Sequence, residues 1–254
     1  MNASRPGALR WLAGLPAFAE WLGFNQRRCS HCSAPYFPGE LRGDFASLRL
    51  CPACQLTLAQ YSGLRCRLCG LPNPGLGAAR LCSQCAREKP PWHGLAYYGI
   101  YDGDLRDLIL RLKYDAELQI IRTLADFLLQ ACQILPAPNL ILAIPQHPSG
   151  LRKRGFNQAH ELGRRLAKLT GFRTASGLLW RTRRSPPQES LGAQARRQNL
   201  QGAFRASDAV ADSVIWLLDD VMTTGSTCAE ATRALLEAGA REVHALFVAR
   251  TPLV

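Results

Sequence analysis

Two carboxylates and a hydroxyl-rich loop lie side by side near the C-terminal end of the chain. Asp219 and Asp220 directly follow the apolar run 214–218, and the loop 223–227 reads Thr-Thr-Gly-Ser-Thr. The apolar run is typical of a parallel strand buried on both faces. The residues after the loop have helical periodicity up to Gly239, a C-terminal stop signal. Because ligands of open α/β sheets bind at the carboxyl ends of strands, we expect a binding site here.

The chemistry of this stretch suits a phosphorylated sugar. Small residues at a helix N-terminus offer unpaired N–H groups and the positive end of the helix dipole to an anion. The threonine and serine hydroxyls of the loop 223–227 add donors, and Gly225 allows the backbone to approach closely. Carboxylates accept hydrogen bonds from vicinal sugar hydroxyls. One sugar 5-phosphate would satisfy both parts.

The stretch resembles the phosphoribosyl pyrophosphate (PRPP) signature of type I phosphoribosyltransferases. In that signature an apolar strand, two acids, two further residues and Thr-Thr-Gly-x-Thr follow one another, as they do here. The resemblance implies that Asp219 and Asp220 hold the ribose hydroxyls. It assigns the 5-phosphate to Thr223, Thr224, Gly225, Ser226 and Thr227. An ordinary strand, polar turn and helix is the alternative.

Eight of the ten cysteines form four C-x2-C pairs. This spacing lets two thiolates bind one ion, and two pairs complete a tetrahedral four-thiolate site, so the pattern predicts about two structural Zn²⁺ ions. The simplest grouping gives one ion Cys29, Cys32, Cys51 and Cys54, and the other Cys66, Cys69, Cys82 and Cys85. Interleaved pairing is the alternative. Zinc binding, worth about 10–16 kcal/mol per site in zinc-finger peptides, would supply folding energy to this segment.

The 254 residues, 47% of them hydrophobic, suffice for one large domain or two small ones. We expect an N-terminal helical segment, a double zinc ribbon, a linker containing Pro90-Pro91 and an α/β domain, at 1–28, 29–85, 86–93 and 94–254. Strands are predicted at 94–101, 140–144, 214–218 and 243–249. Helices are predicted at 102–112, 117–134, 156–169 and 228–238. This alternation of strands and helices indicates a parallel-sheet α/β domain.

The positive charge is concentrated in one quarter of the chain. The span 145–205 contains 13 Lys and Arg and two acidic residues, a net +11 out of +12 for the whole chain. Such a balance calls for anionic partners, although a solvated basic surface is the alternative. Arg152, Lys153 and Arg154 follow a predicted strand end and are expected in a loop that reaches a pyrophosphate. We expect 183–204 to be a mobile loop with a short helix near 190–199.

The apolar segment 11–24 is broken by Pro16 and Glu20 and is too short to span a bilayer. We interpret it as a short docking helix, with a weakly membrane-binding amphipathic segment as the alternative. The sequence carries no recognisable export signal, so a cytoplasmic location is expected.

From Cys29 to Val254 the chain resembles the ComF family, which includes the GntX-type proteins. The resemblance is carried by the cysteine pairs, the PRPP signature and three further motifs: Leu112-Lys113-Tyr114, Arg154-Gly155-Phe156-Asn157-Gln158, and Gln188, Arg197 and Asn199 before Gly202-Ala203-Phe204. It implies a double zinc ribbon in front of a type I phosphoribosyltransferase-like domain, and a link to natural competence. It also adds Lys113 to Arg152 and Arg154 as residues expected at the PRPP site.

Two functions fit the sequence. The first is a phosphoribosyltransferase in which a nucleophile of unknown identity attacks C1 of PRPP, with Mg²⁺ bridging the pyrophosphate and the ribose. The second is a non-catalytic module that binds single-stranded DNA or proteins of the competence machinery, with the zinc ribbons as a docking surface. The basic span favours the second function, and the complete PRPP signature favours binding of a ribose phosphate in both.

Overall fold

The structure is a computed structural model that describes residues 26–37, 49–72, 81–146, 148–182 and 202–252. The chain forms two compact units, Met1–Thr57 and Leu58–Val254. The second cysteine group therefore belongs to the same unit as the α/β sheet. The domain boundaries expected from the sequence at 28/29, 85/86 and 93/94 remain predictions.

The smaller unit is built around a short antiparallel hairpin and one helix. Strand β1 (Arg27–Arg28) pairs with β2 (Pro35–Tyr36), and helix α2 spans Pro52–Thr57. In the turn between the strands, the N–H of Cys29 donates to the Ala34 carbonyl at 2.9 Å and the N–H of Ser33 to the Cys29 carbonyl at 3.0 Å. These bonds fold the backbone around the first cysteine pair.

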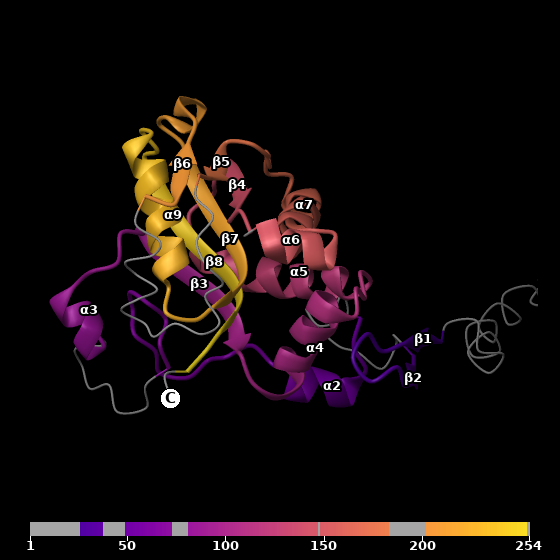
Figure 1. Ribbon diagram of the computed structural model, residues 1–254. Coiled ribbons are helices and arrows are strands. Elements are labelled where there is room, and N and C mark those ends of the chain that lie inside the picture. The colour runs from indigo at the N-terminus through magenta and orange to yellow at the C-terminus, as the bar shows by residue number, and fades with distance from the viewer. Residues whose placement is uncertain (1–25, 38–48, 73–80, 147, 183–201, 253–254) are drawn as a thin grey trace, which may run out of the picture. The chain divides into compact units, whose positions relative to one another are not determined.

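The larger unit contains a four-stranded parallel sheet, as the sequence predicts. Its strands are β3 (Gly94–Ile100), β4 (Leu140–Ala143), β7 (Val214–Met222) and β8 (Glu242–Arg250), in the order β3-β8-β7-β4 (Figure 1). The apolar runs lie in the two central strands, which are covered on both faces. This confirms the predicted parallel-sheet α/β fold.

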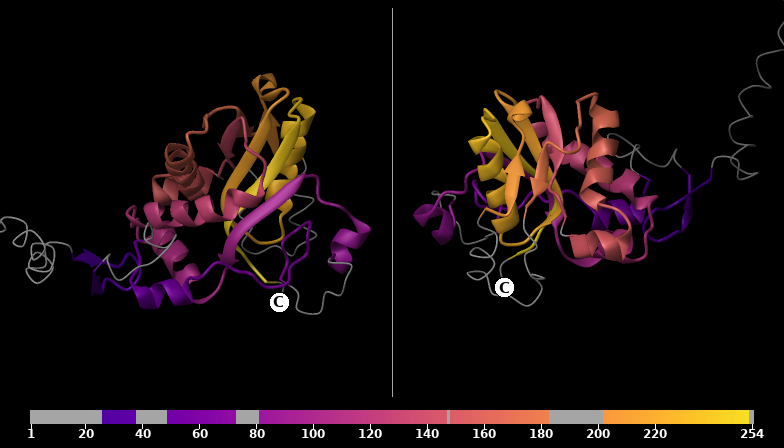
Figure 2. Two further views of the ribbon diagram at one scale, coloured as in Figure 1. Left: turned by 180° about the vertical axis from the view of Figure 1, so that it is seen from behind. Right: turned by 45° about the horizontal axis from the view of Figure 1, so that its top comes forward.

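Helices cover both faces of this sheet (Figure 2). Helices α5 (Ile120–Ala131) and α7 (Gln158–Thr170) pack on one face and against each other, whereas α9 (Ser226–Glu237) packs on the other. A hairpin of β5 (Leu179–Arg181) and β6 (Phe204–Ala206) lies beside α9. The remaining elements are α3 (Ser83–Arg87), α4 (Gly103–Tyr114), η4 (Cys132–Ile134), α6 (Pro148–Arg154) and η6 (Asp208–Val210).

The alternation of side chains along the strands fills a core on each face. Ile215 and Leu217 of β7 are buried in the cluster that contains Leu235 of α9. On the face of the sheet that α5 covers, Tyr98 stacks on Phe127 with ring centroids 4.0 Å apart. The two cysteines outside the C-x2-C pairs, Cys132 and Cys228, are buried, as expected of core thiols.

The structure corrects two sequence-based expectations near the site. Strand β7 does not end at 218 but continues through both acids to Met222, because β8 is equally long and pairs with it as far as Arg250. The basic run 152–154 lies in helix α6 and not in a loop. Strands β5 and β6 were not expected.

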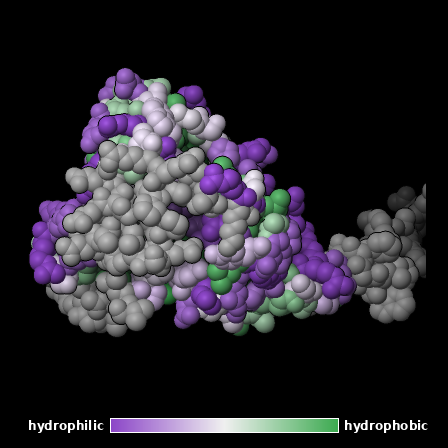
Figure 3. Space-filling view, in the orientation of Figure 1, coloured by the Kyte–Doolittle hydropathy of each residue, from purple (hydrophilic) through white to green (hydrophobic). Residues whose placement is uncertain are grey.

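Several predictions fall outside the described residues. These are the helix at 11–24, the loop segment 183–201 with its helix at 190–199, and the motif residues Gln188, Arg197 and Asn199. None of the described helices is long and apolar enough to cross a membrane. In the view of Figure 3 the coloured part of the surface is mainly hydrophilic, with small, scattered hydrophobic areas.

Candidate functional site

The two acids of the PRPP signature lie near the carboxyl end of the central strand β7. Asp220 is buried, with 4% of its surface exposed. Its Oδ2 accepts a hydrogen bond from Gln158 Nε2 at 2.7 Å and pairs with Lys113 Nζ at 2.9 Å. Lys113 comes from the last turn of α4, and Gln158 is the first residue of α7. Three elements therefore converge on one carboxylate, and the structure brings the predicted Lys113 to the acid pair.

The Arg-Gly-Phe-Asn-Gln motif supplies the amide that holds Asp220. Asn157 caps α7, its Oδ1 accepting from the N–H of His160 at 3.3 Å, so that Gln158 begins the helix with a buried side chain. Gln146, just after β4, donates in turn to the Gln158 amide oxygen. Neither glutamine was expected at the site from the sequence. A polar residue on the buried face of an amphipathic helix is the signal that marks Gln158.

The surroundings of the acid pair shift the pKa of Asp219 toward neutral pH. Burial and the adjacent Asp220 carboxylate raise the pKa of Asp219 to about 7, although Lys113 and Arg154 oppose this. Burial alone would lower the pKa of Lys113, but Asp220 and Asp219 raise it above its usual value. Lys113 therefore stays protonated, and Asp219 exchanges a proton near neutral pH.

The loop after β7 has the geometry of an anion site. Gly225 has a φ of 79°, and a Cβ there would lie 2.6 Å from Met222 Cε and 3.1 Å from Trp92 Cη2, so only glycine fits. Helix α9 begins at Ser226, and its N-cap makes no side-chain hydrogen bond. The hydroxyls of Thr224 and Ser226 lie 2.9 Å apart. The first turn of α9 thus has N–H groups to offer to a phosphate.

Of the predicted basic residues, the structure brings Arg154 but not Arg152 toward the acids. The Arg154 guanidinium lies 5.5 Å from the Tyr114 ring centroid, and its charge lowers the pKa of Asp219. Arg152 is exposed on α6, and no hydrogen bond or ion pair links it to the acids in the part of the chain that the structure describes. His147 and the side chain of Lys153 lie outside the described residues.

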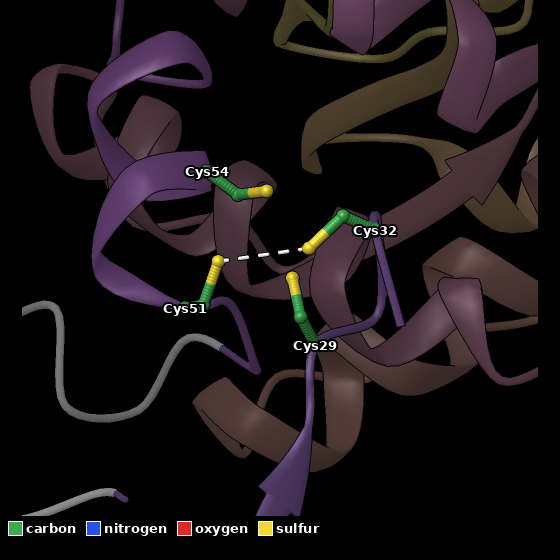
Figure 4. Close-up of side chains that lie close together, drawn as sticks. All are labelled: Cys29, Cys32, Cys51 and Cys54. Atoms are coloured by element: carbon green, nitrogen blue, oxygen red, sulfur yellow. Dashed lines mark hydrogen bonds between the residues drawn. The ribbon is translucent and has the colours of Figure 1, made fainter. Parts of the chain in front are cut away.

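The eight paired cysteines form two separate clusters. In each cluster the sulfur atoms lie within 4.8 Å of one another, and none of these cysteines is in a disulfide. Figure 4 shows the side chains of Cys29, Cys32, Cys51 and Cys54 converging. The Sγ atoms of Cys32 and Cys51 lie 3.7 Å apart, as do those of Cys69 and Cys82. A tetrahedral site with metal–sulfur bonds of about 2.3 Å requires about 3.8 Å.

This geometry settles the grouping that the sequence left open. The first two pairs form one cluster, here called the first cluster, and Cys66, Cys69, Cys82 and Cys85 form the second cluster. The interleaved alternative is wrong. Both donor sets fit a tetrahedral metal ion and provide four ligands, so they suit a structural role.

The structure is thus that of a parallel-sheet α/β protein with an acid pair and a glycine loop at the end of a central strand, and with two four-cysteine groups that could each hold a metal ion. No family model matches the chain. It is 34% identical over 210 residues to the DNA utilization protein YhgH of Salmonella typhi, covering 80% of this chain and 90% of that protein.

Two further relatives extend the match over most of the chain. The identity is 31% over 242 residues with competence protein F of Haemophilus influenzae, covering 90% and 99% of the two chains. It is 32% over 253 residues with YhgH of Escherichia coli K12, covering 97% and 98%. The chain belongs to the family of the DNA utilization protein YhgH and competence protein F, which confirms the resemblance seen in the sequence.

A solved structure, that of the allosteric regulatory enzyme of purine biosynthesis, matches 49% of this chain and 24% of its own. The match has 23% identity and a TM-score of 0.33, a likeness too slight to bear on function.

Proposed function

We propose that the larger unit binds PRPP, or another ribose 5-phosphate, together with Mg²⁺. The observation that carries the proposal is the acid pair on β7, separated by a short loop from the N-terminus of α9, whose N-cap residue is Gly225. Asp219 and Asp220 would accept from the ribose hydroxyls, and residues 223–227 would donate to the 5-phosphate. Mg²⁺ prefers oxygen ligands and substrate phosphates, which this site would bring together.

As an enzyme, the protein would transfer the phosphoribosyl group to an acceptor nucleophile. A nucleophile of the acceptor forms a bond to C1 while the bond from C1 to the pyrophosphate oxygen breaks, and pyrophosphate leaves with the electron pair. The protein contributes positioning and charge stabilisation. Lys113 and Arg154 lie near the acid pair and would supply positive charge to the site.

Binding of PRPP with Mg²⁺ is expected to tighten as the pH rises. The pKa of Asp219 is about 7, and only the ionised carboxylate accepts from two sugar hydroxyls. Between about pH 6 and about pH 8 its ionised fraction rises roughly tenfold. Calorimetric titrations at both pH values measure the effect, and Asp219→Asn, which cannot titrate, should remove this part of it. Equal pH dependence in the parent and the variant would contradict the role of Asp219, and no binding by the parent would contradict the proposed function.

We further propose that the ion in both cysteine clusters is zinc. The protein purified under reducing conditions is expected to contain about two zinc ions per chain, because each cluster offers four thiolates and no other ligand. Metal analysis combined with alkylation of accessible thiols measures this. Iron in place of zinc, or a metal-free protein whose paired cysteines form disulfides, would overturn it.

A second candidate function is binding of single-stranded DNA by the cytoplasmic protein, alone or with other competence proteins. Two observations favour it: relatives are named for DNA utilization and competence, and the span 145–205 has a net charge of +11. The exposed Arg152 and Arg164 are described members of this span. They would contact phosphates without base recognition.

Binding to a short single strand is expected to weaken about a hundredfold between roughly 50 and 250 mM salt. This follows if about four or five phosphates are contacted, at a logarithmic slope of about 0.7 per contact. Arg152→Glu with Arg164→Glu should flatten the slope, whereas Arg106→Glu with Arg122→Glu, exposed on α4 and α5 and outside the span, serves as a control with the same change of charge. Fluorescence anisotropy measures the affinities. An equal loss of affinity in the two variants would show that DNA binding depends on the total charge and not on this surface.

A further inference from the structure

Arg250, the last residue of β8, joins the loop 223–227, here called the phosphate loop after its proposed ligand, to the second cysteine cluster. Its side chain is buried, with 3% of the residue exposed. One nitrogen, Nη1, donates to the carbonyl oxygens of Met222 and Thr223, where the loop begins. Another, Nε, donates to the carbonyl oxygen of Cys69 at 3.0 Å. A single guanidinium therefore holds backbone atoms of both parts.

Trp92 makes a second connection between the same two parts. Its Nε1 donates to the Leu68 carbonyl at 2.7 Å, one residue before Cys69. The far edge of its ring lies against Gly225, where Cη2 would be only 3.1 Å from an added Cβ. Trp92 is itself buried, with 7% exposed. The knuckle that runs from Cys66 to Cys69 thus supports the loop at two points.

A cavity lies beside these two side chains. The cavity, of about 610 Å³, is lined by Thr224, Gly225 and Ser226 of the loop and by Cys69, Cys82 and Cys85 of the second cluster. Trp92 and Arg250 also line this cavity. Within the described part of the chain, Arg250 and Trp92 give the loop directed contacts to the backbone of the second cluster.

The contacts of Arg250 also orient the donors of the loop. A trans peptide is planar, and its C=O and N–H point in opposite directions. The carbonyls of Met222 and Thr223 point toward Arg250, so the N–H groups of Thr223 and Thr224 point away from it. Neither N–H has an acceptor within the described part of the chain. Arg250 therefore directs two free donors to the side opposite the second cluster.

We propose that metal binding by the second cluster holds the phosphate loop in the conformation that binds phosphate. Arg250 and Trp92 are the positioning residues that connect the cluster to the loop. The inference rests on the proposed binding of a ribose 5-phosphate. Metal–thiolate bonds fix the backbone of the Cys66–Cys69 knuckle, and with it the carbonyls that Trp92 and Arg250 hold. Loss of this metal releases both carbonyls and lets the loop donors turn away from the phosphate.

The two clusters allow a matched test. Cys85→Ser removes a ligand of the second cluster, and Cys54→Ser the corresponding ligand of the first, which belongs to the other compact unit. Each variant is expected to lose about one metal ion per chain. Only Cys85→Ser should weaken ribose 5-phosphate, about tenfold or more, while Cys54→Ser stays within about twofold of the parent. Equal affinities in the two variants would overturn the proposal.

Hydrogen exchange separates this inference from the proposed function. In Cys85→Ser, amides of the segment 222–228 should exchange faster without any ligand, whereas Cys54→Ser should leave them unchanged. If the parent binds no ribose 5-phosphate but exchange still rises in Cys85→Ser alone, the proposed function fails and the support of the loop stands. Unchanged hydrogen exchange in both variants would show that the second cluster does not hold the loop in position.

Variants of the positioning residues identify the connection. Arg250→Met removes all the donors, and Arg250→Lys keeps the charge and one donor group, so Lys should recover part of the affinity for ribose 5-phosphate. Trp92→Phe keeps an aromatic ring but removes both the bond to Leu68 and the contact of Cη2 with Gly225, so it should weaken binding by a few-fold. Metal content should be unaffected in all three. Parent-like affinity in Arg250→Met would rule out Arg250 as the connection.

Discussion

Replacing both Asp219 and Asp220 with asparagine is expected to abolish measurable PRPP binding. An asparagine side chain has one carbonyl oxygen and no charge, so it is a much weaker acceptor for paired sugar hydroxyls. A hydrogen bond to a charged group is worth about 1.5–3 kcal/mol, so loss of two weakens binding at least about a hundredfold. Calorimetry with PRPP and Mg²⁺ measures the loss. Parent-like affinity in the double variant would show that the ribose lies elsewhere.

The environment of Lys113 determines the controls for this experiment. The double variant leaves the Lys113 ammonium, which pairs with Asp220 at 2.9 Å, without a carboxylate. Lys113→Gln in the same background removes that unpaired charge and serves as the folded reference. Thermal unfolding of both variants verifies the fold. Inorganic phosphate should still bind weakly to the loop 223–227 of the double variant, because the α9 N-terminus is unchanged.

The sequence predicts those parts of the site whose functional residues are close together in the chain. The acids, the glycine and the hydroxyls lie within nine residues, 219–227, and the strand and helix that hold them directly flank them. The cysteine pairs are equally local, because a two-residue gap suffices to form half of a metal site. The apolar strands separated by amphipathic helices predict the parallel sheet for the same reason.

The contacts that the sequence could not predict join residues far apart in the chain. Gln158 and Asp220 are separated by 62 positions, and Arg250 and Cys69 by 181. No local period relates such residues, and only the packing of α7 and β8 brings them together. Even the length of β7 is a tertiary effect, since its last residues pair with Ala249 and Arg250. Such contacts arise from the completed sheet and not from local propensity.

Replacing Lys113 with methionine is expected to destabilise the larger unit by about 3–5 kcal/mol. The Lys113 and Asp220 side chains are 16% and 6% exposed, so the pair is largely removed from water. Without the ammonium, the Asp220 carboxylate keeps the Gln158 amide but faces the neighbouring Asp219 carboxylate unpaired. Urea unfolding followed by circular dichroism measures the loss. A loss below about 1 kcal/mol would mean that water already screens the pair.

The pH dependence and a double variant test the cause of this destabilisation. Burial and Asp220 already raise the pKa of Asp219, and removal of Lys113 takes away a charge that opposes this. When the folded-state pKa of an acid exceeds its unfolded value, stability declines as the pH rises through the window between the two. Lys113→Met should therefore be closest to the parent near about pH 5 and furthest from it near about pH 8. Adding Asp220→Asn removes the unpaired carboxylate, so the double variant should recover most of the lost stability at the higher pH, whereas a purely steric effect of methionine would persist in the double variant at both pH values.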